Sequence, residues 1–288
     1  HKAWIVEAGP LRGRLRIEYR FRTSRLWLDV LLGAGGSSVE FRGKLRWLEP
    51  RKIVKVAIPV NCRAETATHS IPYGALERPN NGEEEPIQEW IDLSDARGGL
   101  AVINDGSYSV SVEGREIRLT VARSTPYAWH IPPGLPANMD KVQWDSAQWH
   151  QDTGELEFRL LAVPHEGHWR ATEVFGLASR FNRVPMLMAE YAHDGPLAPE
   201  AGHIEVNGPV QVSVIKRAEK GEGLIVRAVE CFGEGGKASL RLVHQDVAWS
   251  ATFGAWQIRT FRVRGGEVSD EPLLEDDFSP EPAGRRSI

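Results

Sequence analysis

HSIPYGALERP at 69–79 begins the stretch that decides the fold, and it continues through QEWIDLSD (88–95), GLAVINDGSYSV (99–110) and EIRLTVARSTPY (116–127). Each segment is short and rich in β-branched and aromatic residues, and turn-forming residues separate one segment from the next. The Asn-Asp-Gly run at 104–106 tolerates positive φ and favours a hairpin. The acidic run Glu83–Glu85 is predicted to be a solvated loop. The stretch therefore predicts short antiparallel strands of a β-sandwich.

The same two-residue period extends toward the N-terminus. Positions 15, 17, 19 and 21 are apolar or aromatic, whereas positions 14, 16, 18 and 20 are charged. Such alternation is typical of a half-buried strand. Similar runs occur at 26–32, 39–47, 53–60, 109–112, 117–122 and 156–162. We therefore predict an all-β chain.

One segment breaks this period and divides the chain. WRATEVFGLASRFN (169–182) places apolar residues at helical spacing, which predicts one short amphipathic helix. Pro and Gly residues between 185 and 199 mark a boundary, and a second strand-rich block follows from about 203 to 264. We predict a large sandwich over 1–195, a small one over 196–270, and an acidic, Pro-rich tail over 271–288 that packs weakly or stays disordered.

Composition narrows the class of protein. With 35 Lys and Arg against 39 Asp and Glu, the chain offers no electrostatic argument for binding nucleic acid or an anionic membrane. No stretch approaches the roughly 20 apolar residues of a membrane span, and the first residues lack the apolar core of a signal peptide. Cys62 and Cys231 are expected to be free, buried thiols in a reducing compartment. Together these features favour a cytoplasmic protein.

The residue types in the predicted turns are those of a surface that handles sugars, because aromatic rings stack on a pyranose while Arg and Asp bind its hydroxyls. Of the ten Trp, those at 90, 129, 144 and 149 fall in or near predicted loops, and those at 4, 27, 47 and 256 fall in strands and are expected in the core. A glycosidase needs two carboxyl groups at a defined separation. The sequence places no such pair, so no catalytic residue is nominated.

His165 and His168 form an H-x-x-H motif between a strand and the predicted helix. Two imidazoles hold a metal only with further ligands placed by the fold. We expect these residues to lie in a loop that fixes the entry of the helix, and we expect no metal site or cofactor within this chain.

The chain resembles the C-terminal β-rich region of retaining α-mannosidases of glycoside hydrolase family 38. The segments that carry the resemblance occur in the family's order. They are EAGPLRGRLRIEYRF (7–21), KLRWLEPRKIVKVAIPVN (44–61) with a Trp-x-Glu turn, HSIPYGALERP, EPIQEWIDLSD (85–95), 99–127, LLAVPHEGHW (160–169), and 212–233 with WQIRTFRV (256–263). The resemblance implies a large sandwich of the galactose-mutarotase type followed by a smaller one.

The resemblance also implies a function. Family members carry an N-terminal β/α barrel in which zinc and an Asp nucleophile hydrolyse α-mannosides, and no segment matching that barrel occurs here. The chain is thus expected to be a non-catalytic part, whose partners are mannosides and the barrel of the same protein. Arg123 is the candidate for a side chain lent to the sugar pocket, with an ion pair within the sandwich as its alternative role. Tyr127 follows it, and weaker candidates for the rim are Tyr73, Trp90, His69 and Tyr108.

Two other functions stay open. The first is a free-standing carbohydrate-binding module that uses loop aromatics. The second is a mutarotase-like sugar epimerase, which would need a His/Glu acid–base pair on a concave face.

Overall fold

The computed structural model describes residues 1–124, 151–196 and 200–275. Antiparallel strands form nearly all of its regular structure, with one α-helix, so the predicted all-β class is confirmed. The chain divides into two compact units, residues 1–185 and 186–288, which are described separately. The predicted Tyr127 lies outside the described residues.

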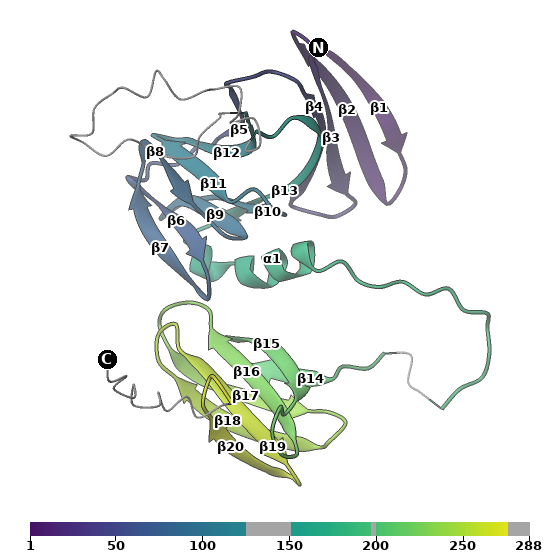
Figure 1. The fold of residues 1–288 in the computed structure, drawn as a ribbon, viewed down its shortest axis with the longest axis vertical. Helices are drawn as coiled ribbons and strands as arrows, with labels where there is room; N and C mark the ends of the chain where they lie inside the picture. Colours follow the sequence, from purple (N-terminus) through teal and green to yellow (C-terminus); the bar gives the residue numbers. More distant parts are fainter. Residues whose placement is uncertain (125–150, 197–199, 276–288) are drawn as a thin grey trace, which may run out of the picture. The chain divides into compact units, whose positions relative to one another are not determined.

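A nine-stranded sheet is the larger layer of the first unit, in the order β1-β2-β3-β4-β13-β10-β9-β6-β7 (Figure 1). We call the face that carries Ile91 and Leu93 the inner face, and the face that carries Trp90 and Asp92 the outer face. Its strands are β1 (Lys2–Ala8), β2 (Arg12–Phe21), β3 (Ser24–Gly33), β4 (Val39–Trp47), β6 (Thr66–Ile71), β7 (Gly74–Pro79), β9 (Trp90–Asp95), β10 (Gly98–Asn104) and β13 (Gly154–Glu166).

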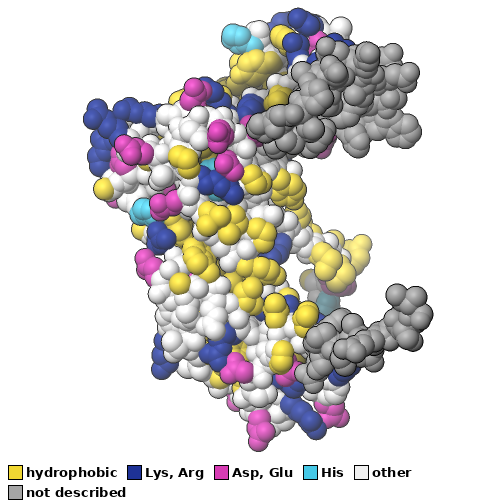
Figure 2. All heavy atoms as spheres, turned by 60° about the vertical axis from the view of Figure 1, so that its left-hand side comes forward, with side chains coloured by type: hydrophobic (Ala, Val, Ile, Leu, Met, Phe, Trp, Pro, Cys, Tyr) yellow, Lys and Arg dark blue, Asp and Glu magenta, His cyan; other side chains and the backbone are white. Residues whose placement is uncertain are grey.

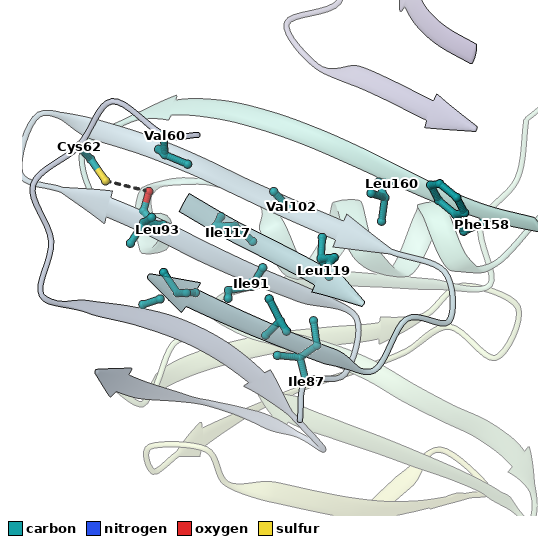
Figure 3. Close-up of a cluster of buried hydrophobic side chains, with 13 residues drawn as sticks. Val60, Cys62, Ile87, Ile91, Leu93, Val102, Ile117, Leu119, Phe158 and Leu160 are labelled. Atoms are coloured by element: carbon teal, nitrogen blue, oxygen red, sulfur yellow. Dashed lines mark hydrogen bonds between the residues drawn. The ribbon is translucent and has the colours of Figure 1, made fainter. Parts of the chain in front are cut away.

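A four-stranded sheet in the order β5-β12-β11-β8 packs on part of the inner face. Its strands are β5 (Ile53–Pro59), β8 (Asn81–Pro86), β11 (Ser109–Glu113) and β12 (Glu116–Arg123). Buried side chains of both sheets form one core, drawn in Figure 3, in which Leu93 and Leu160 of the large sheet meet Ile117 and Leu119 of the small one. This core makes the unit a sandwich.

Close packing in this core requires a glycine on β4. Gly43 pairs with Phe158 of β13, and a Cβ on Gly43 would lie 2.1 Å from the Phe158 ring. The ring therefore occupies the space that any side chain at position 43 would need.

The acidic run Glu83–Glu85 is a strand and not a loop, because it lies within β8. The Glu84 carboxylate accepts hydrogen bonds from the Ser109 hydroxyl at 2.5 Å and from Lys55 and Thr120. These partners lie on β11, β5 and β12, so one carboxylate ties all the strands of the small sheet together. The prediction of a solvated loop was wrong because it rested on the charge of these residues alone, and the sequence does not reveal the cross-strand partners of Glu84.

A short helical segment covers the outer face. The predicted helix is confirmed for α1 (Val174–Asn182), whereas Trp169–Ala171 form a single 3-10 turn, η4. Trp90 contacts the rings of Trp169 and Phe175 at centroid distances of 5.1 and 5.2 Å. The Asn182 side chain donates to the Asn104 carbonyl at 3.1 Å. These contacts fix the helix across β9 and β10.

The second unit is a smaller sandwich of two sheets, β14-β17-β18 and β15-β16-β19-β20. Residues from both sheets, among them Val226, Leu240 and Phe253, form its core. Its strands are β14 (Ile204–Asn207), β15 (Val210–Arg217), β16 (Leu224–Glu230), β17 (Gly236–Leu242), β18 (Val247–Phe253), β19 (Ile258–Arg264) and β20 (Glu267–Glu271).

A buried carboxylate holds two loops of the second unit together. Glu230 has no exposed surface, and its side chain accepts hydrogen bonds from the backbone N–H groups of Phe232 at 2.9 Å and of Gly233 and Trp256 at 2.8 Å. Trp256, predicted in a strand, lies in the turn before β19 with φ 56°. The carboxylate takes the place of backbone acceptors that these turns lack.

Candidate functional site

Arg123, the strongest candidate from the sequence, is the last residue of β12 and pairs with Ile53 of β5. The Arg123 backbone N–H donates to the Asp152 carboxylate at 2.9 Å, and the Asp152 N–H donates back to the Arg123 carbonyl at 2.8 Å. The two residues are 29 positions apart in sequence. This reciprocal pair holds the backbone that carries the guanidinium.

Ser124, the next residue, is fully buried and joins this strand end to the turn between β4 and β5. Its Oγ accepts hydrogen bonds from Trp47 Nε1 and from the Lys52 N–H, both at 3.2 Å, and donates to the Glu49 carbonyl. Its backbone exchanges further hydrogen bonds with Arg51 and Lys52. The Ser124 hydroxyl thus holds the Trp-x-Glu turn against the strand end that carries Arg123.

The Glu49 side chain extends this network to the β2–β3 turn. Its Oε1 accepts from the Thr23 N–H at 3.1 Å, from the Thr23 hydroxyl at 3.0 Å and from the Ser24 hydroxyl at 3.1 Å. Burial raises the pKa of Glu49, but these hydrogen bonds and the nearby Arg22 outweigh it, so the pKa is lowered. Glu49 is therefore a fixed anion and not a proton donor at neutral pH.

A groove of about 400 Å³ lies beside this network, where the small sheet ends at β5. Its walls include Tyr19, Phe21 and Trp47 from the inner face of the large sheet, and Lys52 and Ile53 from the start of β5. The Phe21 and Trp47 rings are stacked, with centroids 6.5 Å apart. Tyr19 and Phe21 are 41% and 49% exposed, so the groove presents aromatic faces to solvent.

Two other predicted residues share the Arg123 end of the first unit. Tyr73 lies in the turn between β6 and β7 and is 50% exposed, and Tyr108 precedes β11 and is 60% exposed. The registers place the end of β6, the start of β11 and the end of β12 at the same end of the sandwich. The fold therefore brings these tyrosines to the end that carries Arg123.

Trp90 and His69 do not offer their side chains to a ligand in this structure. Trp90 is 1% exposed, and it is the first residue of β9, at a position predicted to fall in or near a loop. His69 is 2% exposed, and its Nδ1 lies 3.1 Å from Arg78 Nη1. Because a guanidinium can only donate, Nδ1 accepts and the proton of the neutral ring is on Nε2. Burial lowers the pKa of His69 to about 4, and the charge of Arg78 adds to this effect.

His165 forms a buried pair on the outer face. Its Nε2 lies 2.6 Å from Asp92 Oδ2, and the Ser94 hydroxyl donates to Asp92 Oδ1 at 2.5 Å. The His165 and Asp92 side chains are 5% and 1% exposed. The hydrogen bond to Asp92 raises the pKa of His165 against the effect of burial. His165 is the penultimate residue of β13, so it lies in a strand and not in the predicted loop.

Cys62 and Cys231 are free and buried, as predicted. Burial raises the pKa of Cys231 to about 12, so its thiol is unreactive at neutral pH. In the described ranges, no three His, Cys, Asp or Glu side chains gather in a way that could hold a metal ion. Nor does any described helix have the length and apolar character to cross a bilayer.

Acidic and basic side chains are interspersed on the described part of the face in Figure 2, in keeping with the balanced composition. The sequence reasoning missed Ser124, Glu49, Asp152 and Lys52. The Trp-x-Glu turn was a signal for Glu49 alone. The other three act through partners far along the chain, and spacing in the sequence does not reveal such partners.

The fold defines an all-β protein made of two sandwich units. The family models of two protein domains match its sequence. The glycosyl hydrolases family 38 C-terminal domain matches residues 1–131, and the family 38 C-terminal beta sandwich domain matches residues 209–251. Together they cover more than half of the 288 residues. The chain belongs to glycosyl hydrolase family 38, and it is the C-terminal region of such a protein.

Similar proteins carry α-mannosidase names. Human alpha-mannosidase 2C1 is 28% identical over 221 residues, which are 73% of this chain and 19% of the human protein. Alpha-mannosidase G of Dictyostelium discoideum is 26% identical over 249 residues, 80% of this chain and 21% of that protein. The chain thus spans about a fifth of the length of these curated relatives.

Solved structures from Enterococcus faecalis share the fold. A glycosyl hydrolase family 38 protein superposes with a TM-score of 0.73 at 18% identity, over 91% of this chain and 36% of that chain. An alpha-mannosidase from the same species gives a TM-score of 0.73 at 17% identity, over 91% of this chain and 35% of that chain.

Proposed function

We propose that this chain is the non-catalytic C-terminal part of an α-mannosidase, and that it supplies scaffold and one wall of the sugar pocket. The observation that carries the proposal is the position of Arg123. Its backbone is held by Asp152, and its neighbour Ser124 is held by the β4–β5 turn, within the segment that matches the family's C-terminal domain. A side chain carried on a backbone held this firmly suits the positioning of a substrate or of a partner group.

The Arg123 guanidinium has two possible roles in the intact enzyme. It donates paired hydrogen bonds to sugar hydroxyls, or it orients a carboxylate of the catalytic domain. Either role leaves bond cleavage to groups outside this chain. By the resemblance, hydrolysis of α-mannosides proceeds with retention of configuration, which requires two carboxyl groups about 5 Å apart. The described residues do not fit a metal site, and by the resemblance the zinc belongs to the N-terminal barrel.

Kinetics of the full-length protein test the role of Arg123. We expect Arg123→Met to lower kcat/KM for an aryl α-mannoside by about 100-fold or more, the usual effect of removing a charge-stabilising donor. Arg46→Met is the matched control, because Arg46 is an exposed arginine of β4. The 288-residue chain alone is expected to give no turnover, with or without added zinc. Equal activities of the two variants, or turnover by the chain alone, would overturn the proposal.

A carbohydrate-binding module is the second candidate, because Tyr73 and Tyr108 are exposed at one end of the first unit. Titration calorimetry of the 288-residue chain with mannose and mannobiose tests it. Millimolar binding that is lost in Tyr108→Ala would favour the module. Trp90→Ala does not serve this test, since Trp90 is buried and its loss would disturb the core.

A mutarotase-like epimerase gains no support from the His–carboxylate pair that the structure describes, because His165 and Asp92 are both buried. Polarimetry of freshly dissolved sugar decides this alternative, which requires a faster approach to equilibrium with the chain than without it. We further propose a cytoplasmic location, supported by two buried cysteines that form no disulfide.

A further inference from the structure

The inner face of β1 and β2 is apolar and has no second layer above it among the described residues. Ile5 is 71% exposed, Leu15 37%, Tyr19 41% and Phe21 49%. Ile5 pairs with Leu15, and the alternation of β2 places Leu15, Tyr19 and Phe21 on the same face. These side chains continue the face that is buried under the small sheet farther along, at β4 and β13.

The difference between the two sheets explains this exposure. The large sheet has nine strands, whereas the small sheet has four and ends at β5 (Figure 1). A sheet with one apolar face is stable when that face packs on another layer. Contiguous apolar surface that stays exposed marks an interaction site.

The edge of the large sheet adds a second feature. In the described part of the chain, β1 pairs with β2 alone, so one row of its backbone N–H and C=O groups has no partner strand. Trp4, Ile5 and Val6 on this edge strand are all at least 42% exposed. An apolar edge of this kind is a template for an added strand.

The groove beside β5 supplies a charge. Lys52 lines it next to Phe21 and Trp47, and no described carboxylate forms an ion pair with its ammonium group. By contrast, Lys55, which lies within β5, is paired with Glu84. The surface is therefore complementary to a partner that presents both apolar side chains and an acidic group.

We propose that this docking face, formed by Ile5, Leu15, Tyr19, Phe21 and the groove with Lys52, is covered in the full-length protein by the part of the polypeptide that this chain does not contain. This inference rests on the proposed function and deepens it by naming the surface that the partner occupies. The curated relatives are about five times as long as the matched region, so a large partner within the same polypeptide is expected. That partner adds a strand to β1, packs apolar side chains on Leu15 and Tyr19, and places a carboxylate opposite Lys52.

Cysteine accessibility tests the proposal. Leu15→Cys and Tyr19→Cys are made in the 288-residue chain and in the full-length protein, and maleimide labelling is read at each site by mass spectrometry. Arg46→Cys is the control, because Arg46 lies on β4 of the same sheet and is exposed. We expect all three to label in the short chain, and only Arg46→Cys to label in the full-length protein.

The outcomes separate this inference from the proposed function. Labelling of both face variants in a full-length protein that still hydrolyses an aryl α-mannoside would overturn the inference and leave the function standing. Protection in the short chain that is lost on dilution would also overturn it, because a second copy would then be the occupant. A pair of charge variants gives an independent check. Lys52→Glu should lower the melting temperature of the full-length protein more than that of the short chain, whereas Lys237→Glu, an exposed strand residue of the second unit, should not.

Discussion

His165 Nε2 lies 2.6 Å from Asp92 Oδ2, and the strand between them, β10, carries a glycine, Gly99, opposite His165. Gly99 of β10 is opposite both Ser94 and His165. A Cβ on Gly99 would lie 2.3 Å from the Leu93 carbonyl oxygen and 2.4 Å from Ser94 Cβ. The imidazole therefore reaches across one strand to bind a carboxylate on the next.

Removing His165 should destabilise the first unit strongly. In His165→Leu, the buried Asp92 carboxylate keeps Ser94 but loses its cationic partner, and breaking a buried pair in this way costs about 3–5 kcal/mol. Urea unfolding below pH 6.5 measures the loss. His168→Leu is the control, since His168 is exposed and surface substitutions stay within about 0.5 kcal/mol. Equal midpoints for the two variants would contradict the role assigned to the pair.

The same pair gives stability a defined pH dependence. Because the folded pKa of His165 is raised, its contribution is fully present below the unfolded value of about 6.5 and is lost as pH rises through the folded pKa. The gap in unfolding free energy between the wild type and His165→Leu should therefore narrow above that pKa. A gap that widens with pH would show that the charged imidazole does not stabilise the fold.

His69 should act in the opposite direction. Its folded pKa is about 4, so between about pH 6.5 and 4 the unfolded chain binds a proton that the folded chain does not. Stability should fall as pH falls through this window, and His69→Gln should flatten the profile while its side-chain oxygen still accepts from Arg78. Urea midpoints at half-unit intervals from pH 4 to 7.5 provide the measurement. Identical slopes for the two proteins would rule out a neutral, buried His69.

Gly43 and Gly13 form a matched pair for testing the core. Gly43→Ala pushes a methyl group into the Phe158 ring, and overpacking of this kind costs about 1–3 kcal/mol. Gly13→Ala on β2 meets nothing within 4 Å and should leave stability unchanged or slightly higher. Thermal unfolding of both variants checks the difference. A loss for Gly13→Ala as large as that for Gly43→Ala would mean that strand geometry, and not ring packing, decides the effect.

Glu230→Gln should weaken the second unit alone. The amide replaces a carboxylate that accepts three backbone hydrogen bonds, and the expected loss is about 1.5–3 kcal/mol. Hydrogen exchange read by mass spectrometry should show faster exchange in residues 204–271 and no change in residues 2–123. Glu267→Gln, at an exposed position of β20, is the control. Unchanged exchange around Phe232 and Trp256 would refute the bridging role of Glu230.

Much of the fold was predictable from the sequence because strand alternation and turn residues are local signals. The alternation at 14–21 predicted β2, and the helical spacing after Trp169 predicted α1. The strand at Glu83–Glu85 is missed from the sequence because the partners of Glu84 lie 25–36 positions away, Lys55 before it and Ser109 and Thr120 after it. A charge that is paired across strands looks the same in a sequence as a charge in water.

The candidate site was predictable only in part. The prediction of Arg123 rests on the family resemblance, and the exposure of Tyr73 and Tyr108 fits the expected rim. The prediction for Trp90 and His69 rests on residue type, which does not distinguish a ring that contacts a sugar from a ring in the core. Only the burial of the two side chains makes that distinction.

Ser124 carries a consequence for reading genetic variation in this protein. Its hydroxyl is 77 and 72 positions away in sequence from Trp47 and Lys52, yet it ties both to the peptide that bears Arg123. Under the proposed function, replacing this serine with alanine would loosen that peptide and lower mannoside turnover in the intact enzyme, although the hydroxyl is fully buried. A mutational survey scored by activity would then flag Ser124 as a nucleophile. The hydrogen bonds that its hydroxyl forms with Trp47, Lys52 and Glu49 are the reason to reject that label.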